Sequence, residues 1–116
     1  MKIKMKKNYS YKENIIWFAD KQIILCEKIA EVVAFDKCVV IRKKYTNENP
    51  TNNVVAYDFD GNKIWEIDNI IKPLEPQTIV SIGKRDSQYI SIVTFTGLNL
   101  LIEAQTGRVA DKKITK

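Results

Sequence analysis

The sequence predicts an all-β domain of antiparallel strands, and three observations lead to this fold class. Short apolar runs rich in β-branched and aromatic residues recur along the chain of 116 residues, as is typical of strands. Turn-forming pairs such as Asp60-Gly61 and Thr106-Gly107 separate several of these runs. No sustained 3.6-residue apolar period is present, so no regular helix is expected.

The clearest element is a β-hairpin over residues 53–67, with the sequence NVVAYDFDGNKIWEI. Its arms are apolar and aromatic, and Asp60-Gly61 between them supplies the positive φ angles that a tight two-residue turn needs. A second copy follows at residues 98–114, with Thr106-Gly107 in the turn position. The chain therefore repeats a structural unit.

Two further hairpins are expected before residue 46. Their strands and turns are 15–19, Asp20-Lys21 and 22–26, followed by 31–35, Asp36-Lys37 and 38–45. Before them, Tyr9 and Tyr11 alternate with polar residues, as at the start of a strand. A short apolar run alone does not exclude a buried helix, but the β-branched and aromatic content of these runs favours strands.

Two longer connections interrupt the hairpins. Thr46–Asn52, TNENPTN, has the composition of a loop. Asp68–Gln77 contains Pro73 and Pro76, which the interior of a strand would not tolerate. In a four-stranded meander the connections after the second and fourth strands leave at the same edge, so these two connections are expected side by side.

The second connection divides the chain into two similar halves, each with four predicted strands. The matching segments are Glu31–Asp36 with Thr78–Lys84, Cys38–Tyr45 with Gln88–Phe95, Asn53–Phe59 with Leu98–Ala104, and Lys63–Ile67 with Arg108–Lys112. Four antiparallel strands that recur about every 45 to 50 residues are typical of propeller blades. We therefore predict a partial, or half, β-propeller; a β-sandwich or barrel is the alternative.

The hairpin sequences resemble a known family. VVAYDFDGNKIWEI resembles the blade signature of quinoprotein-type and related bacterial propellers, in which an apolar strand ends in Asp before a Gly-containing turn and a strand with Trp. LLIEAQTGRV resembles the same signature, with Glu103 in place of the Asp and without the Trp. The resemblance implies about two and a half blades. Because complete propellers have at least four, it implies no quinone or metal site here, and no cofactor is expected.

The net charge of +5 is concentrated at the N-terminus. Lys2, Lys4, Lys6, Lys7 and Lys12 precede the first acidic residue, and the remaining chain has 14 basic and 14 acidic residues. We therefore predict a basic, flexible tail over residues 1–12 and a single all-β domain over 13–116. Such a tail could hold phosphate groups, but mobile solubilising termini are more common.

The sequence contains no apolar run long enough for a membrane span or a signal-peptide core. Cys26 and Cys38 have no pairing pattern around them, so we expect two buried free thiols. Both observations favour a cytoplasmic location.

Catalytic chemistry is not expected. The chain has no histidine, which removes the usual general base and the Ser-His and Cys-His nucleophile pairs. Asp58, Asp60, Asn62 and Glu66 resemble part of a calcium loop, but the helix-loop-helix site needs Gly where Lys63 stands. We assign no catalytic, cofactor-binding or metal-binding residue.

These observations favour a non-catalytic protein-binding module, and by analogy of size and kind an immunity protein that neutralises a cognate bacterial toxin. A nucleic-acid-binding module that uses the basic tail is the alternative. The exposed faces of the two end sheets are expected to be apolar, which would allow a homodimer. The predicted partner-binding residues lie on the long loops and are Lys44, Tyr45, Asn47, Glu48 and Lys72.

Overall fold

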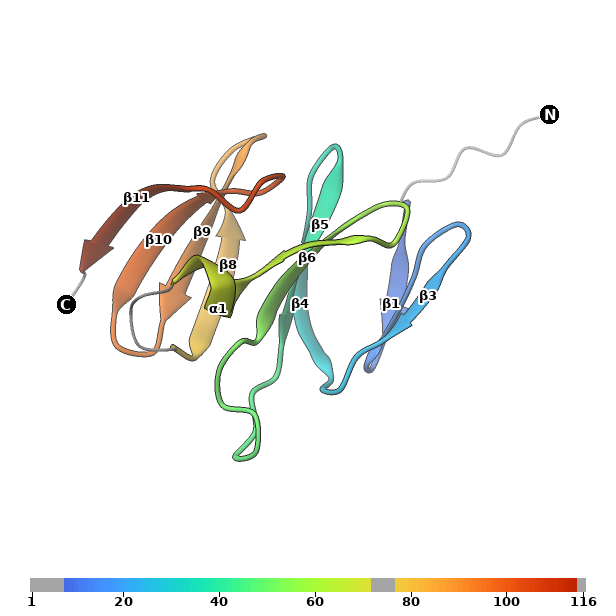
Figure 1. Ribbon diagram of the computed structural model, residues 1–116, viewed down its shortest axis with the longest axis horizontal. Helices are drawn as coiled ribbons and strands as arrows, with labels where there is room; N and C mark the ends of the chain where they lie inside the picture. The colour runs from blue at the N-terminus through green and yellow to red at the C-terminus, as the bar shows by residue number, and fades with distance from the viewer. Residues whose placement is uncertain (1–7, 72–76, 115–116) are drawn as a thin grey trace.

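The protein consists of three antiparallel sheets that lie side by side along the long axis of the molecule (Figure 1). The computed structural model describes residues 8–71 and 77–114. We refer to the N-terminal sheet (β1–β3), the middle sheet (β4–β7) and the C-terminal sheet (β8–β11). The all-β prediction is confirmed. Each of the three sheets is open, so the barrel alternative is wrong.

The N-terminal sheet has three short strands in sequence order. They are β1 (Ser10–Lys12), β2 (Ile15–Trp17) and β3 (Gln22–Ile24). Strand β1 lies within the stretch 1–12, for which the sequence predicts a flexible tail, so the folded part begins before residue 13. The β2–β3 turn is closed by the Phe18 N–H, which donates to the Lys21 carbonyl at 2.7 Å. Its central residues are therefore 19 and 20, one position before the predicted pair.

The middle sheet has four strands, again in sequence order. They are β4 (Ile29–Ala34), β5 (Cys38–Lys43), β6 (Val54–Asp58) and β7 (Lys63–Glu66). The Phe35 N–H donates to the Cys38 carbonyl at 2.7 Å. The predicted two-residue turn at Asp36-Lys37 is thereby confirmed.

The predicted tight turn at Asp60-Gly61 is wrong, because the β6–β7 turn is wider. The Asp58 N–H donates to the Asn62 carbonyl at 2.9 Å, and the Asp58 carboxylate accepts the backbone N–H groups of residues 60 and 62. Gly61 has a φ of 86°, whereas Asp60 is not among the residues with positive φ. A two-residue type I′ turn needs positive φ at both positions, and the carboxylate stabilises the wider alternative.

The C-terminal sheet repeats the strand order of the middle sheet. Its strands are β8 (Ile79–Lys84), β9 (Tyr89–Thr94), β10 (Leu98–Glu103) and β11 (Val109–Ile114). The four-strand repeat is confirmed. The predicted alignment of β5 with β9, which matched Cys38 with Gln88, is shifted by one residue. Cys38 pairs with Asp58 as Tyr89 pairs with Glu103, so Cys38 corresponds to Tyr89. A one-residue shift exchanges the two faces of a strand.

One short helix interrupts the strands, where the sequence predicted none. Helix α1 (Ile67–Ile70) is a single turn that follows β7, and the Ile71 N–H donates to the Ile67 carbonyl at 3.1 Å. The side chain of Ile67, the first residue of this helix, is fully buried. The helix therefore starts the predicted connection 68–77, whose Pro73 and Pro76 lie outside the described residues.

The middle sheet is buried on both faces, because its strands alternate between two hydrophobic cores. One face, with residues such as Val40 and Trp65, packs against Ile90, Ile92 and other residues of the C-terminal sheet. The other face packs on the N-terminal sheet; this second core contains Ile16, Phe18, Leu25, Ile29, Val39, Ile41, Val55 and Tyr57. The three sheets thus form a stack, and this explains why β5 and β6 are apolar on both sides.

Candidate partner-binding edge

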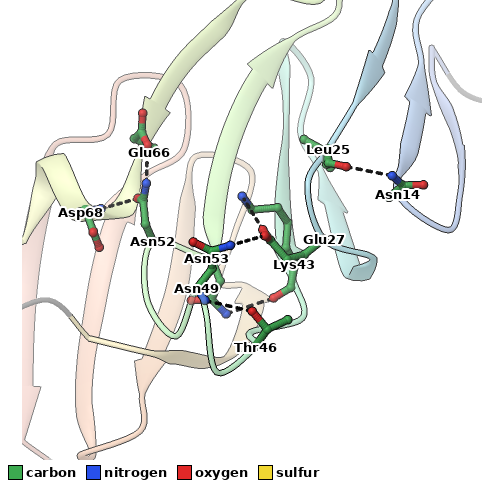
Figure 2. A network of polar contacts seen from close by, with 10 residues as sticks. All are labelled: Asn14, Leu25, Glu27, Lys43, Thr46, Asn49, Asn52, Asn53, Glu66 and Asp68. Atoms are coloured by element: carbon green, nitrogen blue, oxygen red, sulfur yellow. Dashed lines mark hydrogen bonds and ion pairs between the residues drawn. The ribbon is translucent and has the colours of Figure 1, made fainter.

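The β5–β6 loop, residues 44–53, meets the described parts of the β7–β8 connection, residues 67–71 and 77–78, at one edge of the stack, which we call the long-loop edge; Figure 2 shows the contact between Asn52 and Asp68. The Asp68 N–H donates to Asn52 Oδ1 at 3.0 Å. The Thr78 hydroxyl donates to the Pro50 carbonyl. The prediction that these connections lie side by side is confirmed for the described residues.

The tip of the β5–β6 loop forms its own turn. The Thr46 N–H donates to the Asn49 carbonyl at 3.1 Å, and the Asn49 N–H donates to the Thr46 hydroxyl at 2.9 Å. Threonine stabilises turns through such local bonds. The loop tip is therefore closed internally, without help from a partner.

Glu27, in the β3–β4 connection, ties the loop to the N-terminal half of the molecule (Figure 2). Its carboxylate accepts a hydrogen bond from Asn49 Nδ2 at 2.9 Å and forms an ion pair with Lys43 at 3.4 Å. The Lys44 N–H also donates to the Lys28 carbonyl at 2.8 Å. Backbone and side-chain bonds thus hold the outgoing half of the loop.

Asn53 joins the returning half of the loop to the C-terminal sheet. Its side chain is 2% exposed, and its amide donates to the carbonyls of Lys43 and Ile79 at 3.1 and 2.8 Å. Its Oδ1 accepts the Ile79 N–H at 3.0 Å. The amide therefore pairs backbone groups that the start of β8 would otherwise leave buried without partners.

Asn52 is one of two non-glycine residues with positive φ in the described part of the chain, at 55°. Asparagine tolerates this conformation better than most residues, and its side chain stabilises it here by contacting Asp68 and Glu66. The hydrogen bond from Asn52, followed by that from Lys63 at 2.9 Å, lowers the pKa of Glu66. Glu66 thus stays ionised and holds the loop to β7.

Most of the predicted partner-binding residues are exposed on this loop. Tyr45 is 50% exposed, and Lys44, Asn47 and Glu48 are also exposed. Lys72 lies outside the described residues. A shallow hollow of about 520 Å³ adjoins Tyr45, and its lining comprises Cys26, Glu27, Lys28, Lys44, Tyr45, Thr46, Glu48 and Asn49. The aromatic side chain of Tyr45 therefore forms part of the wall of a shallow recess.

The sequence did not single out Phe95, which is 74% exposed at the same edge. It lies in the turn between β9 and β10, and its N–H donates to the carbonyl of Thr78, the residue that contacts Pro50. Phe95 was expected as the end of a strand. An apolar residue directly before Thr96-Gly97, inside the turn, was the signal that could have identified it.

A second hollow, of about 650 Å³, lies at the opposite edge, between the tight turns of the middle and C-terminal sheets. Glu103 and Cys38 are among its lining residues. Both Glu103 oxygens accept hydrogen bonds, from Thr106 at 2.6 Å and from Gln88 at 2.7 Å. Burial raises the pKa of the Cys38 thiol to about 11. The thiol therefore stays protonated near neutral pH, which makes it a poor nucleophile.

The two cysteines are free, as predicted, but only Cys38 is buried, whereas Cys26 is exposed. Within residues 8–71 and 77–114, no three His, Cys, Asp or Glu side chains are grouped closely enough to hold a metal ion. The Asp58 carboxylate instead accepts hydrogen bonds from its own turn. In the same described part of the chain, no helix has the length and apolarity needed to cross a membrane.

Comparison with known proteins places the chain in a family but adds no relative of known activity. Neither a curated protein nor a solved structure matches the sequence. A family model described as "Domain of unknown function (DUF7957)" matches residues 6–114, which span all eleven strands. The chain therefore belongs to the DUF7957 family.

Proposed function

We propose that this protein is a non-catalytic protein-binding module whose long-loop edge contacts the partner. The observation that carries the proposal is Tyr45, which is half exposed on a loop held from both sides. Exposed aromatic residues beside recesses are typical anchors of protein interfaces, where a few side chains carry most of the binding energy.

The fixed conformation of the loop supports this role. A flexible loop loses conformational entropy when a partner orders it, at a cost of about 0.5–1.5 kcal/mol for each immobilised side chain. Here the Thr46–Asn49 turn, the Glu27 contacts and Asn53 hold the loop in the free protein. Less of the contact energy is then lost on binding.

The narrower proposal is that the partner is a bacterial toxin domain and that this chain is its immunity protein. The small all-β domain and the absence of histidine support it, as does the lack of a free activated thiol at Cys38. Co-expression with the product of the neighbouring gene would test it. Growth should be restored by this chain if that product is toxic alone.

We also propose that the stack is an incomplete propeller, with two four-stranded blades and one three-stranded blade. The repeated strand order supports this arrangement. So does the approach of the first strands, since Glu31 on β4 accepts the Ile82 N–H of β8 at 3.2 Å. Trp65, on the fourth strand, fills the space between the same sheets and donates to the Ala104 carbonyl at 2.8 Å.

The decisive experiment is affinity capture from the native cell with the wild-type chain, Tyr45→Ala and a matched control, Tyr11→Ala. Tyr11 is 42% exposed on β1 and does not line the hollow. The Tyr45 change should alter the free energy of unfolding by about 0.5 kcal/mol or less, yet weaken binding of the captured protein by about tenfold or more. Equal affinity of Tyr45→Ala and the wild type would refute the assignment of this edge.

Deletion of residues 2–7 tests the nucleic-acid alternative. This change removes four of the N-terminal lysines and leaves β1 in place. Protein capture should survive it. Capture of RNA or DNA by the wild type, lost on this deletion, would support the alternative instead.

A further inference from the structure

Within the described residues, no strand or helix covers the outer side of the N-terminal sheet, which ends the stack (Figure 1). Residues that pair across antiparallel strands share a face. Tyr11, Ile16 and Ile23 form the row on the side of the middle sheet, where Ile16 is fully buried. The rows on either side of it point outward, and we call this outward side the N-face. It comprises Lys12, Ile15 and Ile24 in one row, and Ser10, Trp17 and Gln22 in the other.

The N-face is apolar at its centre. Ile15 and Trp17 lie on the central strand β2 and are partly exposed, and Ile24 beside them is 66% exposed. The Trp17 indole donates to Gln22 Oε1 at 2.9 Å, so its polar group is already paired. The centre of the N-face is therefore available for apolar contact.

The excess positive charge lies in the same part of the chain. Residues 1–28 contain seven lysines and three acidic residues, whereas residues 29–116 contain 12 basic and 11 acidic residues. Even Lys2 is only eight positions from Ser10 on β1, which limits the distance between them to about 28 Å. Lys12 itself lies on the N-face. Positive charge thus accompanies the apolar surface.

The size and chemistry of the N-face discriminate between the surfaces that could cover it. Three strands about 4.8 Å apart, each of three residues rising about 3.3 Å, give a face of roughly 14 by 10 Å. A standard protein interface is far larger, since it buries about 800 Å² on each partner. Isoleucine cannot stack on nucleic-acid bases as aromatic side chains do. A lipid surface requires neither, because each inserted apolar side chain and each nearby lysine adds to binding.

We propose that the N-face binds the surface of an anionic phospholipid bilayer. Ile15 and Ile24 enter the boundary between headgroups and acyl chains, and Trp17 lies at the headgroup level, where its amphipathic ring is favoured. The lysines of residues 2–12 attract the anionic headgroups, and each strengthens binding by about fivefold when it is near the surface. Binding is peripheral and reversible. The N-face is distinct from Tyr45, so this inference does not depend on the proposed function.

Co-sedimentation of the purified full chain with vesicles tests the proposal. Vesicles of phosphatidylcholine with about 30% phosphatidylserine should bind the wild type, and vesicles of phosphatidylcholine alone should bind it at least about tenfold less. Deletion of residues 2–7, which removes four lysines, should weaken binding by about a hundredfold or more. Ile24→Ser, which changes an exposed residue and adds no charge, should weaken it by about tenfold. Phe95→Ser, the matched control at a residue that is 74% exposed in the C-terminal sheet, should bind like the wild type.

Tryptophan emission gives a second readout. Trp65 is 7% exposed, so a blue shift on addition of the anionic vesicles would report entry of Trp17 into the bilayer. Failure of the wild type to bind these vesicles would overturn the proposal. So would equal binding of Ile24→Ser and the wild type, because charge alone would then account for the binding. A single-stranded oligonucleotide is the competing ligand: if it shifts the Trp17 emission and Ile24→Ser removes this shift, the N-face binds nucleic acid instead.

Discussion

At the scale of single residues, two glycines with similar backbones differ in what surrounds them. Gly61 and Gly107 have φ angles of 86° and 81°. A Cβ at residue 107 would lie 2.8 Å from Cγ of Trp65, whose indole is fixed by its hydrogen bond to the Ala104 carbonyl. A Cβ at residue 61 would meet Lys21 Cδ at 2.6 Å, which belongs to an exposed, flexible side chain. Trp65 therefore cannot move away from a Cβ at residue 107, whereas the end of the Lys21 side chain can move away from a Cβ at residue 61.

We therefore predict a graded series of alanine variants. Gly107→Ala should lower the free energy of unfolding by about 3 kcal/mol or more, because a steric clash adds to backbone strain. Gly61→Ala should cost about 1 kcal/mol from strain alone. Gly83→Ala, where a Cβ would meet nothing within 4 Å, serves as the control and should be within about 0.5 kcal/mol of wild type. Urea denaturation measures all three; equal losses at positions 61 and 107 would contradict the Trp65 argument.

At the scale of elements, one side chain joins two sheets. Asn53 contacts Lys43 on β5 and Ile79 on β8, which are 10 and 26 residues away in the sequence. No apolar residue of similar size could pair both the N–H and the carbonyl of Ile79. This amide is therefore a buried polar link between the middle and C-terminal sheets at the long-loop edge.

Asn53→Ala should lower the free energy of unfolding by about 2–4 kcal/mol, since it leaves buried N–H and carbonyl groups unpaired. Asn53→Asp should also be destabilising, because a carboxylate cannot donate to the two carbonyls. Asn47→Ala, an exposed amide on the same loop, should change stability by less than about 0.5 kcal/mol. Chemical denaturation measures the free energy of unfolding of the three variants. If Asn53→Ala is as stable as the wild type, the Asn53 link does not contribute to stability.

At the scale of the whole molecule, several carboxylates stabilise turns by accepting hydrogen bonds, and these bonds lower their pKa values. The groups and their main donors are Asp58 with the Asn62 N–H, Glu66 with the Asn52 amide, Asp86 with the Gln88 N–H, and Glu103 with the Thr106 hydroxyl. Their ordinary pKa values are 3.8 for Asp and 4.5 for Glu. Three turns and the β5–β6 loop thus depend on ionised acids.

Acid should therefore destabilise the fold. Because these pKa values are lower in the folded state, the unfolded chain binds more protons once the pH falls toward 4.5. The stabilisation is complete above the ordinary pKa values and is lost as the pH falls through the lowered ones. Denaturation midpoints should be constant from pH 7 to about 5 and should decrease at lower pH. The decrease should be less steep for Glu66→Gln, because this variant lacks one of the four carboxylates. A midpoint that rises on acidification would contradict this assignment.

Much of the fold could be predicted because its signals are local. Hairpin turns, the alternation of side chains and the four-strand repeat depend on residues close together in the sequence, and they led to the correct strands in the middle and C-terminal sheets. The two-residue turn at Asp60-Gly61 was wrong, because the Asp58 side chain competes for the turn amides. The alternation of Tyr9 and Tyr11 with polar residues indicated a strand start, but the lysine-rich composition led to the prediction of a flexible tail over residues 1–12, and β1 lies at its end.

The candidate site was only partly predictable. Loop composition located Tyr45 and its neighbours, but it did not single out Phe95, whose N–H donates to the Thr78 carbonyl at the same edge. Likewise, no local pattern shows that Glu27 holds Asn49 across 22 residues. Contacts of this kind depend on how the sheets stack.

The sequence by itself determined most of the strands, the turn at Asp36-Lys37 and the repeated unit, because these follow from backbone preferences and from the two-residue period of a strand. The β10–β11 turn is wider than the predicted pair Thr106-Gly107, since the Glu103 N–H donates to the Arg108 carbonyl at 2.9 Å. Only the tertiary structure decided which faces are covered. Val40 and Ile15 both lie in apolar strands, yet Val40 is fully buried between two sheets, whereas Ile15 is only partly buried and pairs with the exposed Ile24 in the N-terminal sheet. The physical reason is that the burial of a strand depends on whether another sheet packs against it. The hydrophobic effect is non-directional, so an apolar run favours burial but does not specify which surface covers it.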